Sequence, residues 1–80
     1  MTKEEILQQI NSIFIDILDL HDLTINYATI ATDIDAWDSL THIQLIVGIE
    51  KHFRIRFKSD EINNFNNVGE MCDSVLLKMV

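Results

Sequence analysis

The sequence predicts an all-α fold: a small four-helix bundle with three long helices, one short helix and a long loop between the first two. Three observations support this class. Apolar residues recur at spacings of three and four in separate segments, patterns typical of helix N-termini precede them, and the chain contains no proline. We expect one domain, 1–80, with a modest core, because a chain this short buries only about 60% of its unfolded surface.

The first helix is predicted over residues 3–19. Thr2 and Glu5 fit a capping box, in which each side chain accepts a hydrogen bond from the backbone of the other. An apolar stripe at helical spacing follows, formed by Ile6, Leu7, Ile10, Ile13, Phe14, Ile17 and Leu18. Residues 21–37 lose this period, so we expect a long ordered loop that crosses the core, with room for a short turn of helix.

The second helix is predicted to start after Asp38 and to end near His52. Apolar residues cover more than half of its circumference: Ile43, Leu45, Ile46, Val47 and Ile49. This pattern predicts a central helix in contact with two or more neighbours. Residues 53–57 alternate like a strand, but a lone strand has no pairing partner, so we expect an extended connector that places aromatic side chains in the core.

Two further helices are predicted at the C-terminal end. A short one covers residues 60–64, with Ser59 as its N-cap. Asn67 and Glu70 repeat the capping-box pattern and open the last helix. Its apolar stripe consists of Val68, Met71, Cys72, Val75, Leu76 and Met79. Cys72 is the single cysteine, which excludes an internal disulfide, and its place on the stripe predicts a buried, inert thiol.

Charge and length restrict the function classes. Thirteen acidic and six basic residues give a net charge of −7, which opposes binding to nucleic acid or anionic membranes and suits partners with basic docking surfaces. No segment approaches the ~20 apolar residues of a membrane span, and the N-terminus has no signal-peptide features, so we predict a cytoplasmic protein without membrane insertion. A core plus a deep active site would need a longer chain, which argues against an enzyme.

Ser39 is the most informative candidate site residue. It falls in the first turn of the second predicted helix, directly after Asp38, an acid that can cap this helix. We therefore expect an exposed hydroxyl. The free N–H groups of a helix N-terminus are expected to favour a phosphate attached to it.

Taken with Asp38, Ser39 and Leu40, the order of elements resembles the carrier-protein family, which includes acyl carrier proteins, peptidyl carrier domains and D-alanyl carrier proteins. The resemblance runs from the first helix to Met79, and its most specific stretch is 35–57. It implies that a phosphopantetheinyl transferase attaches 4′-phosphopantetheine from coenzyme A to Ser39. The thiol of this covalent arm would then hold an acyl or aminoacyl group as a thioester. The implied partners are a loading ligase and acceptor enzymes, and the carrier itself is expected to be a monomer and not an enzyme.

Partner contacts are expected near this serine. In the family, the apolar residue after the serine is often touched by partner enzymes. The second helix departs from bacterial fatty-acid carriers, because Glu50 is its only carboxylate and negative charge gathers before it. Trp37 can pack on the loop, or it can contact a partner or the arm. The candidate partner contacts are Asp35, Trp37, Asp38, Leu40, Gln44 and Glu50.

The predicted core also bears on the cargo. Members of the resembled family that shelter long acyl chains do so between the helices, where small or aliphatic residues leave space. This core instead has large side chains, namely Phe53, Phe57, Phe65 and Met71. Because protein interiors tolerate few voids, these residues predict a short or polar cargo such as an aminoacyl or small acyl group.

Other functions remain open at this point. The chain could be a small helical adaptor that binds partners through the helix after Asp38, without a cofactor. A hydrolase using Ser39 and His42 is disfavoured, because residues within one helical turn do not supply the geometry of a triad and no glycine-flanked elbow surrounds the serine. We predict no metal site, because the histidines and Cys72 lack ligand spacing and Trp37 interrupts the one stretch that begins like a calcium loop.

Overall fold

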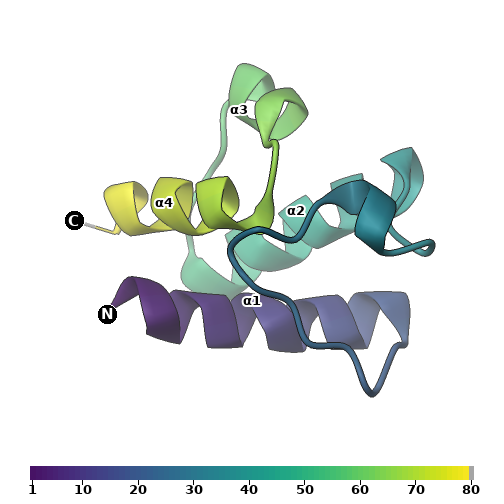
Figure 1. The fold of residues 1–80 in the computed structure, drawn as a ribbon. Helices are drawn as coiled ribbons and strands as arrows, with labels where there is room; N and C mark the ends of the chain where they lie inside the picture. Colours follow the sequence, from purple (N-terminus) through teal and green to yellow (C-terminus); the bar gives the residue numbers. More distant parts are fainter. Residues whose placement is uncertain (80) are drawn as a thin grey trace.

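The computed structural model describes residues 1–79, which form four α-helices (Figure 1). Their bounds are Lys3–Leu18 for α1, Ser39–Phe53 for α2, Ser59–Asn64 for α3 and Val68–Lys78 for α4. A short 3-10 helix, η1, covers Ala31–Asp33 within the long loop. None of residues 1–79 lies in a strand, which confirms the all-α fold and the extended connector after α2. Residue 80 of the predicted domain lies outside the described residues.

Helix α1 packs against both α2 and α4 (Figure 1). The second helix also has more than one neighbour, as predicted, because it packs against α1 and His42 bonds to Ile62 O of α3. Although α2 has many apolar positions, it buries only Leu45, Ile46, Ile49 and Phe53. Ile43 and Val47 are 50% and 40% exposed, since no neighbouring element covers their face of the helix.

The N-terminal cap of α1 forms as predicted. The backbone N–H of Glu5 donates to Thr2 Oγ1 at 3.2 Å, and the backbone N–H of Thr2 donates to Glu5 Oε1 at 2.8 Å. These two bonds satisfy two backbone donors that have no intrahelical partner. The helix ends at Leu18, and Asp19 follows as its C-cap in the left-handed conformation, with φ of 56°.

The caps of α3 and α4 differ in part from the prediction. Ser59 is the first residue of α3 and not its cap, because Lys58 takes the N-cap position. At α4, Asn67 Oδ1 accepts from the backbone N–H of Glu70 at 2.9 Å, as predicted. The Glu70 carboxylate does not return the bond to Asn67, but accepts from the backbone N–H of Asn66 at 3.1 Å.

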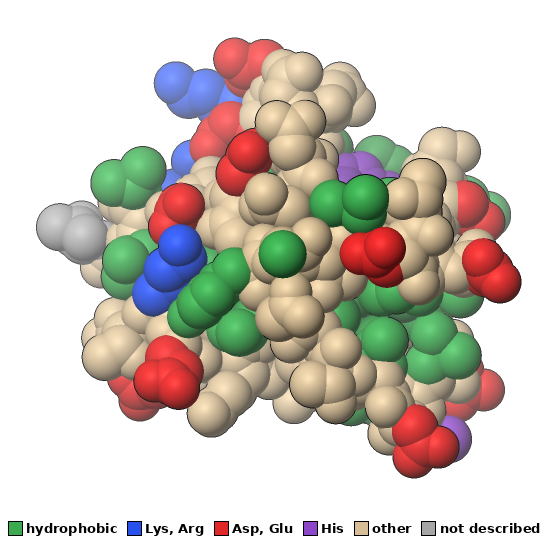
Figure 2. All heavy atoms as spheres, in the orientation of Figure 1, with side chains coloured by type: hydrophobic (Ala, Val, Ile, Leu, Met, Phe, Trp, Pro, Cys, Tyr) green, Lys and Arg blue, Asp and Glu red, His purple; other side chains and the backbone are tan. Residues whose placement is uncertain are grey.

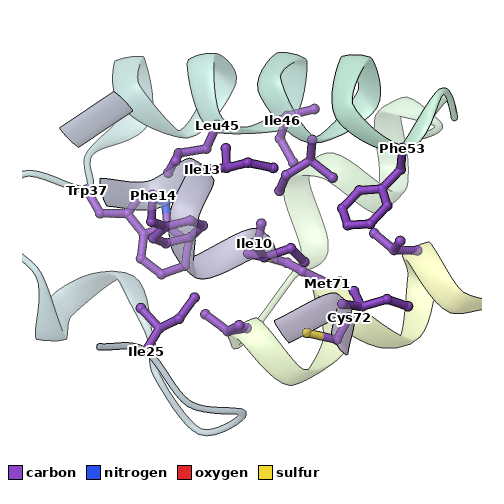
Figure 3. Close-up of a cluster of buried hydrophobic side chains, with 14 of the residues drawn as sticks. Ile10, Ile13, Phe14, Ile25, Trp37, Leu45, Ile46, Phe53, Met71 and Cys72 are labelled. Carbon is purple, nitrogen blue, oxygen red and sulfur yellow. The ribbon is translucent and has the colours of Figure 1, made fainter. Parts of the chain in front are cut away.

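One cluster of buried side chains joins α1, α2, α4 and the long loop (Figure 3). The loop contributes Ile25, Ile34 and Trp37 to this core. In α4, Met71 and Cys72 are fully buried, which confirms the predicted buried thiol. Burial raises the pKa of the Cys72 thiol to about 11, so the group stays protonated and unreactive at neutral pH.

The long loop is also held by the start of α4. The backbone N–H of Val68 donates to Thr29 O at 2.9 Å, and the backbone N–H of Gly69 donates to Tyr27 O at 2.8 Å. These amides belong to the first turn of α4, where a helix leaves its donors without intrahelical partners. The loop carbonyl groups thus accept hydrogen bonds from the unpaired amides of the helix. These bonds fix the path of the chain towards α2.

Polar contacts and aromatic packing hold the connector and α3. Phe57 and Phe65 pack edge to face at 5.5 Å, while α3 itself buries no residue.

Among the described helices, none combines the length and the apolar character that a membrane crossing requires.

Candidate functional site

Ser39 lies at the N-terminus of α2 and is exposed. A capping box holds this end of the helix. Asp38 Oδ1 accepts from the backbone N–H groups of Leu40 and Thr41, both at 2.9 Å, and Thr41 Oγ1 accepts from the backbone N–H of Asp38 at 2.8 Å. The bond from the Thr41 backbone is the largest cause that lowers the pKa of Asp38. The carboxylate therefore stays ionised next to the serine.

This cap corrects one expectation from the sequence. Free N–H groups at the start of α2 were expected to favour a phosphate on Ser39. The amides of Leu40 and Thr41 already donate to the Asp38 carboxylate, and the amide of His42 donates to Asp38 O at 2.8 Å. A phosphate on Ser39 would reach these amides only in competition with the carboxylate.

Trp37 lies in the core immediately before this cap. Its ring packs edge to face against Phe14, with centroids 5.0 Å apart (Figure 3). Its indole Nε1–H donates to His42 Nδ1 at 3.0 Å. Trp37 is 7% exposed and so presents little surface, and the partner contact at this residue stays a prediction. The sequence suggested that Trp37 packs on the loop, and the structure shows the ring packed against Phe14 of α1 instead.

His42 is bonded through both ring nitrogens. Its Nε2 lies 2.9 Å from Ile62 O, and a carbonyl oxygen only accepts, so Nε2 carries the proton. Nδ1 therefore accepts from Trp37, and the assignment of the tautomer follows from the two partners. Because both nitrogens are occupied, the imidazole has no free base for the Ser39 hydroxyl. This geometry opposes the hydrolase alternative.

The other predicted partner contacts fall into two groups. Asp35, Leu40 and Gln44 are exposed, and Leu40 shows 70% of its surface. Glu50 is half-buried, and its Oε2 accepts from the backbone N–H of Phe57 at 2.9 Å. It therefore holds the connector after α2, a role that the sequence did not indicate.

A shallow depression of about 280 Å³ opens beside Ser39. It lies between η1, the start of α2 and α3, and its other lining residues are Ala31, Trp37, Asp38, His42, Ile43 and Asn63. An exposed hydroxyl at the rim of an open depression fits a group attached covalently to its oxygen. Within residues 1–79, no three side chains of the kinds His, Cys, Asp and Glu are grouped so as to hold a metal ion.

The chain is similar to two acyl carrier proteins over most of its length. A curated relative, an acyl carrier protein of Acidothermus cellulolyticus, is 28% identical over 75 residues, which cover 94% of this chain and 89% of the relative. The solution NMR structure of a holo acyl carrier protein from Geobacter metallireducens is 40% identical, with a TM-score of 0.85. That match covers 91% of this chain and 84% of the solved one. No family model matches the chain.

Proposed function

The chain belongs to the acyl carrier protein family, and from this premise we propose that it carries an acyl or aminoacyl group as a thioester on a 4′-phosphopantetheine arm bound to Ser39. The 40% identical relative, which is described as a holo acyl carrier protein, supports the covalent cofactor. The exposed position of Ser39 beside an open depression supports the attachment point. In this proposal residues 1–80 act as one carrier domain and perform no reaction of their own.

Ser39 contributes its alcohol oxygen when the arm is attached. The Oγ–P bond forms as the pyrophosphate P–O bond of coenzyme A breaks, adenosine 3′,5′-bisphosphate leaves, and the hydroxyl proton passes to a base of the transferase. The arm then supplies the thiol that holds the cargo. Asp38 and Thr41 keep the first turn of α2 formed, so the oxygen stays at a fixed place on the surface.

Partner enzymes are proposed to approach along α2. The exposed surface next to Ser39 includes Leu40 and Gln44, and Ile43 and Val47 continue it along the helix as apolar side chains. We therefore expect the transferase, the loading ligase and the acceptor enzymes to meet a mainly apolar helix face, with the charge of Asp35 and Asp38 near its start. The proposal retains the monomeric state and the cytoplasmic location predicted from the sequence.

The filled core supports a short or polar cargo. Met71 is fully buried, Phe53 and Phe57 are each 8% exposed, and the depressions found in the described part of the chain open to the surface. A long acyl chain would have to displace these side chains, which costs packing energy. A solution structure of the loaded carrier with a long chain threaded between the helices would contradict this part of the proposal.

Intact mass tests the attachment. The full chain is incubated with coenzyme A, magnesium and a broad-specificity phosphopantetheinyl transferase. We expect the mass to increase by one phosphopantetheinyl group, and we expect Ser39→Ala to abolish the increase. Ser59→Ala is the matched control, because Ser59 is also an exposed serine at the first position of a helix. An unchanged mass of the wild-type chain would favour the cofactor-free adaptor.

A further inference from the structure

His42 joins three elements beside Ser39. It lies in the first turn of α2, accepts a hydrogen bond from Trp37 of the long loop, and donates one to the carbonyl oxygen of Ile62 in α3. The rings of Trp37 and His42 are inclined by only 17°, with centroids 6.0 Å apart. Both bonds require a neutral imidazole with its proton on Nε2, since Nδ1 must keep a lone pair for the indole N–H.

We propose that neutral His42 is a positioning residue for Ser39, which holds the loop, α2 and α3 in the arrangement that partner enzymes recognise. A proton on Nδ1 would face the indole N–H of Trp37 with a second donor, so this bond would break. Trp37 and His42 both line the depression beside Ser39. Protonation would therefore change the surface next to the attachment point. The functional half of this inference rests on the proposed function of Ser39.

The charged groups around His42 do not offset this loss. The N-cap of its own helix is Asp38, whose carboxylate is already bonded to the amides of Leu40 and Thr41. On α3, Glu61 is turned away, since it accepts from Ser74 Oγ at 2.6 Å and from Lys78.

On the loop side, the charged residue Asp35 is exposed two residues before Trp37. The residue of α1 that packs on the Trp37 ring is Phe14, which carries no charge. Charging His42 thus costs the bond to Trp37 and gains no ion pair.

The consequence extends to α3, because this helix buries no residue of its own. Its attachment depends on polar ties such as the bond from His42 to Ile62 and on the flanking aromatic residues. A shift of His42 towards solvent would loosen the tie between α2 and α3 at the rim of the depression. His42 therefore connects the protonation of one imidazole to the geometry around Ser39.

Trp37 is the only tryptophan, so one indole N–H resonance reports on this contact in the unmodified full chain. Proton NMR from pH 5.5 to 8 follows this resonance together with the ring protons of His42, in the range where imidazoles titrate. We expect the indole shift to follow the His42 titration with one proton. We also expect the indole N–H to exchange with water about fivefold faster in the protonated form, the factor given by loss of one hydrogen bond.

Three variants separate His42 from other titrating groups. His42→Asn keeps an acceptor near the position of Nδ1, and His42→Gln keeps a donor near that of Nε2, but neither titrates in this range. We expect both to abolish the indole transition. His52→Asn, an exposed histidine on the same helix, should leave it intact. An indole resonance that is independent of pH in the wild-type chain, or a transition that survives in His42→Asn, overturns the proposal.

The rate of phosphopantetheine transfer tests the functional half. The initial rate is measured from pH 5.5 to 8 for the wild-type chain and for His42→Asn. The wild-type rate divided by the His42→Asn rate cancels the pH dependence of the transferase. We expect this ratio to fall about two- to fivefold at the acidic end, in line with one lost hydrogen bond.

The outcomes are distinguishable. A constant ratio overturns the positioning role even if the indole titrates. Failure of the wild-type chain to accept the group at any pH overturns the proposed function of Ser39, while the indole titration still decides whether His42 controls Trp37.

Discussion

Glu61 of α3 accepts two hydrogen bonds from Lys78 of α4, at 2.8 Å to Oε1 and 2.9 Å to Oε2. The same carboxylate accepts from Ser74 Oγ at 2.6 Å and from the backbone N–H of Lys58 at 2.8 Å. These contacts lower the pKa of Glu61 to about 2, and the bond from Lys78 is the largest cause. Because α3 buries no residue, this carboxylate is a principal tie between α3 and α4.

Glu61→Gln should lower the free energy of unfolding at pH 7 by about 1–2 kcal/mol, since it removes the charge and leaves the Lys78 donors poorly matched. Urea unfolding followed by circular dichroism measures this change. Glu4→Gln is the control, because Glu4 is exposed on the first turn of α1, and it should change stability by less than about 0.5 kcal/mol.

The effect of Glu61 should also depend on pH. Its folded-state pKa lies near 2, below the ordinary value of 4.5, so its stabilisation is complete above pH 4.5 and is lost as the pH falls towards 2. The stability difference between wild type and Glu61→Gln should therefore shrink over this interval. A difference that stays constant from pH 7 to pH 3 would show that ionised Glu61 does not hold α3.

The two glycines of the chain should respond differently to alanine. A Cβ on Gly69 would lie 2.9 Å from Tyr27 O, a backbone atom of the loop that docks on α4. Gly69→Ala must therefore displace the loop and its hydrogen bond to Gly69 N. We expect a loss of about 1–3 kcal/mol in the free energy of unfolding.

Gly48→Ala is the matched control. Its Cβ would meet the Ile17 Cδ1 atom at 2.8 Å and the Ile13 Cγ2 atom at 3.2 Å, both on side chains of α1. The end of Ile17 can move, and alanine in a helix gains about 1 kcal/mol over glycine, so the net change should be small. Equal losses for the two substitutions in thermal or urea unfolding would contradict the distinction between backbone and side-chain contact.

Periodicity and caps predicted most of the helical architecture, because they are local properties of the chain. The capping pair of Thr2 and Glu5 marks the start of α1, and Asp38 marks that of α2. Periodicity did not reveal that Ile43 and Val47 stay exposed, since it counts apolar positions without knowing which of them a neighbour covers.

The site was predicted only where it is local. The cap by Asp38 and the exposure of Ser39 follow from residues adjacent in sequence. The bonds of His42 to Trp37 and to Ile62 O depend on tertiary packing. Every residue has a backbone carbonyl, so the sequence does not indicate which one a side chain will bond.

Asn11 is a similar case at the other end of the loop. Its Oδ1 accepts from Ile25 N at 2.7 Å, and its Nδ2 donates to Leu23 O at 3.3 Å. The sequence shows only a polar residue close to the apolar stripe of α1. It does not indicate that this residue bonds to the backbone of the loop.

Asp38→Ala should destabilise the start of α2, because the amides of Leu40 and Thr41 would lose their acceptor. We expect the melting temperature at pH 7 to fall by roughly 5 °C, as for loss of an N-cap in a small domain. Asp38→Asn keeps an acceptor oxygen and should retain most of the stability. Because the folded-state pKa of Asp38 is below its ordinary value of 3.8, its contribution to stability is complete above pH 3.8 and is lost at lower pH. The melting temperatures of wild type and Asp38→Ala should therefore converge at low pH.

The net charge of −7 should make stability depend on salt. Figure 2 shows acidic side chains spread across the visible face, whereas Lys and Arg lie only on its left side. Asp33, Asp35 and Asp38 are all exposed within six residues of one another, close to Ser39. These carboxylates repel one another more in the folded chain than in the extended one.

Added salt should weaken this repulsion, since the Debye length falls from about 30 Å at 0.01 M to about 10 Å at 0.1 M. We expect the melting temperature to rise over this range, and we expect magnesium chloride at equal ionic strength to raise it at least as much. A phosphodiester on Ser39 adds about one negative charge beside Asp38, so the modified carrier should respond more strongly than the unmodified one. If neither salt changes the melting temperature, the acidic surface contributes no measurable repulsion.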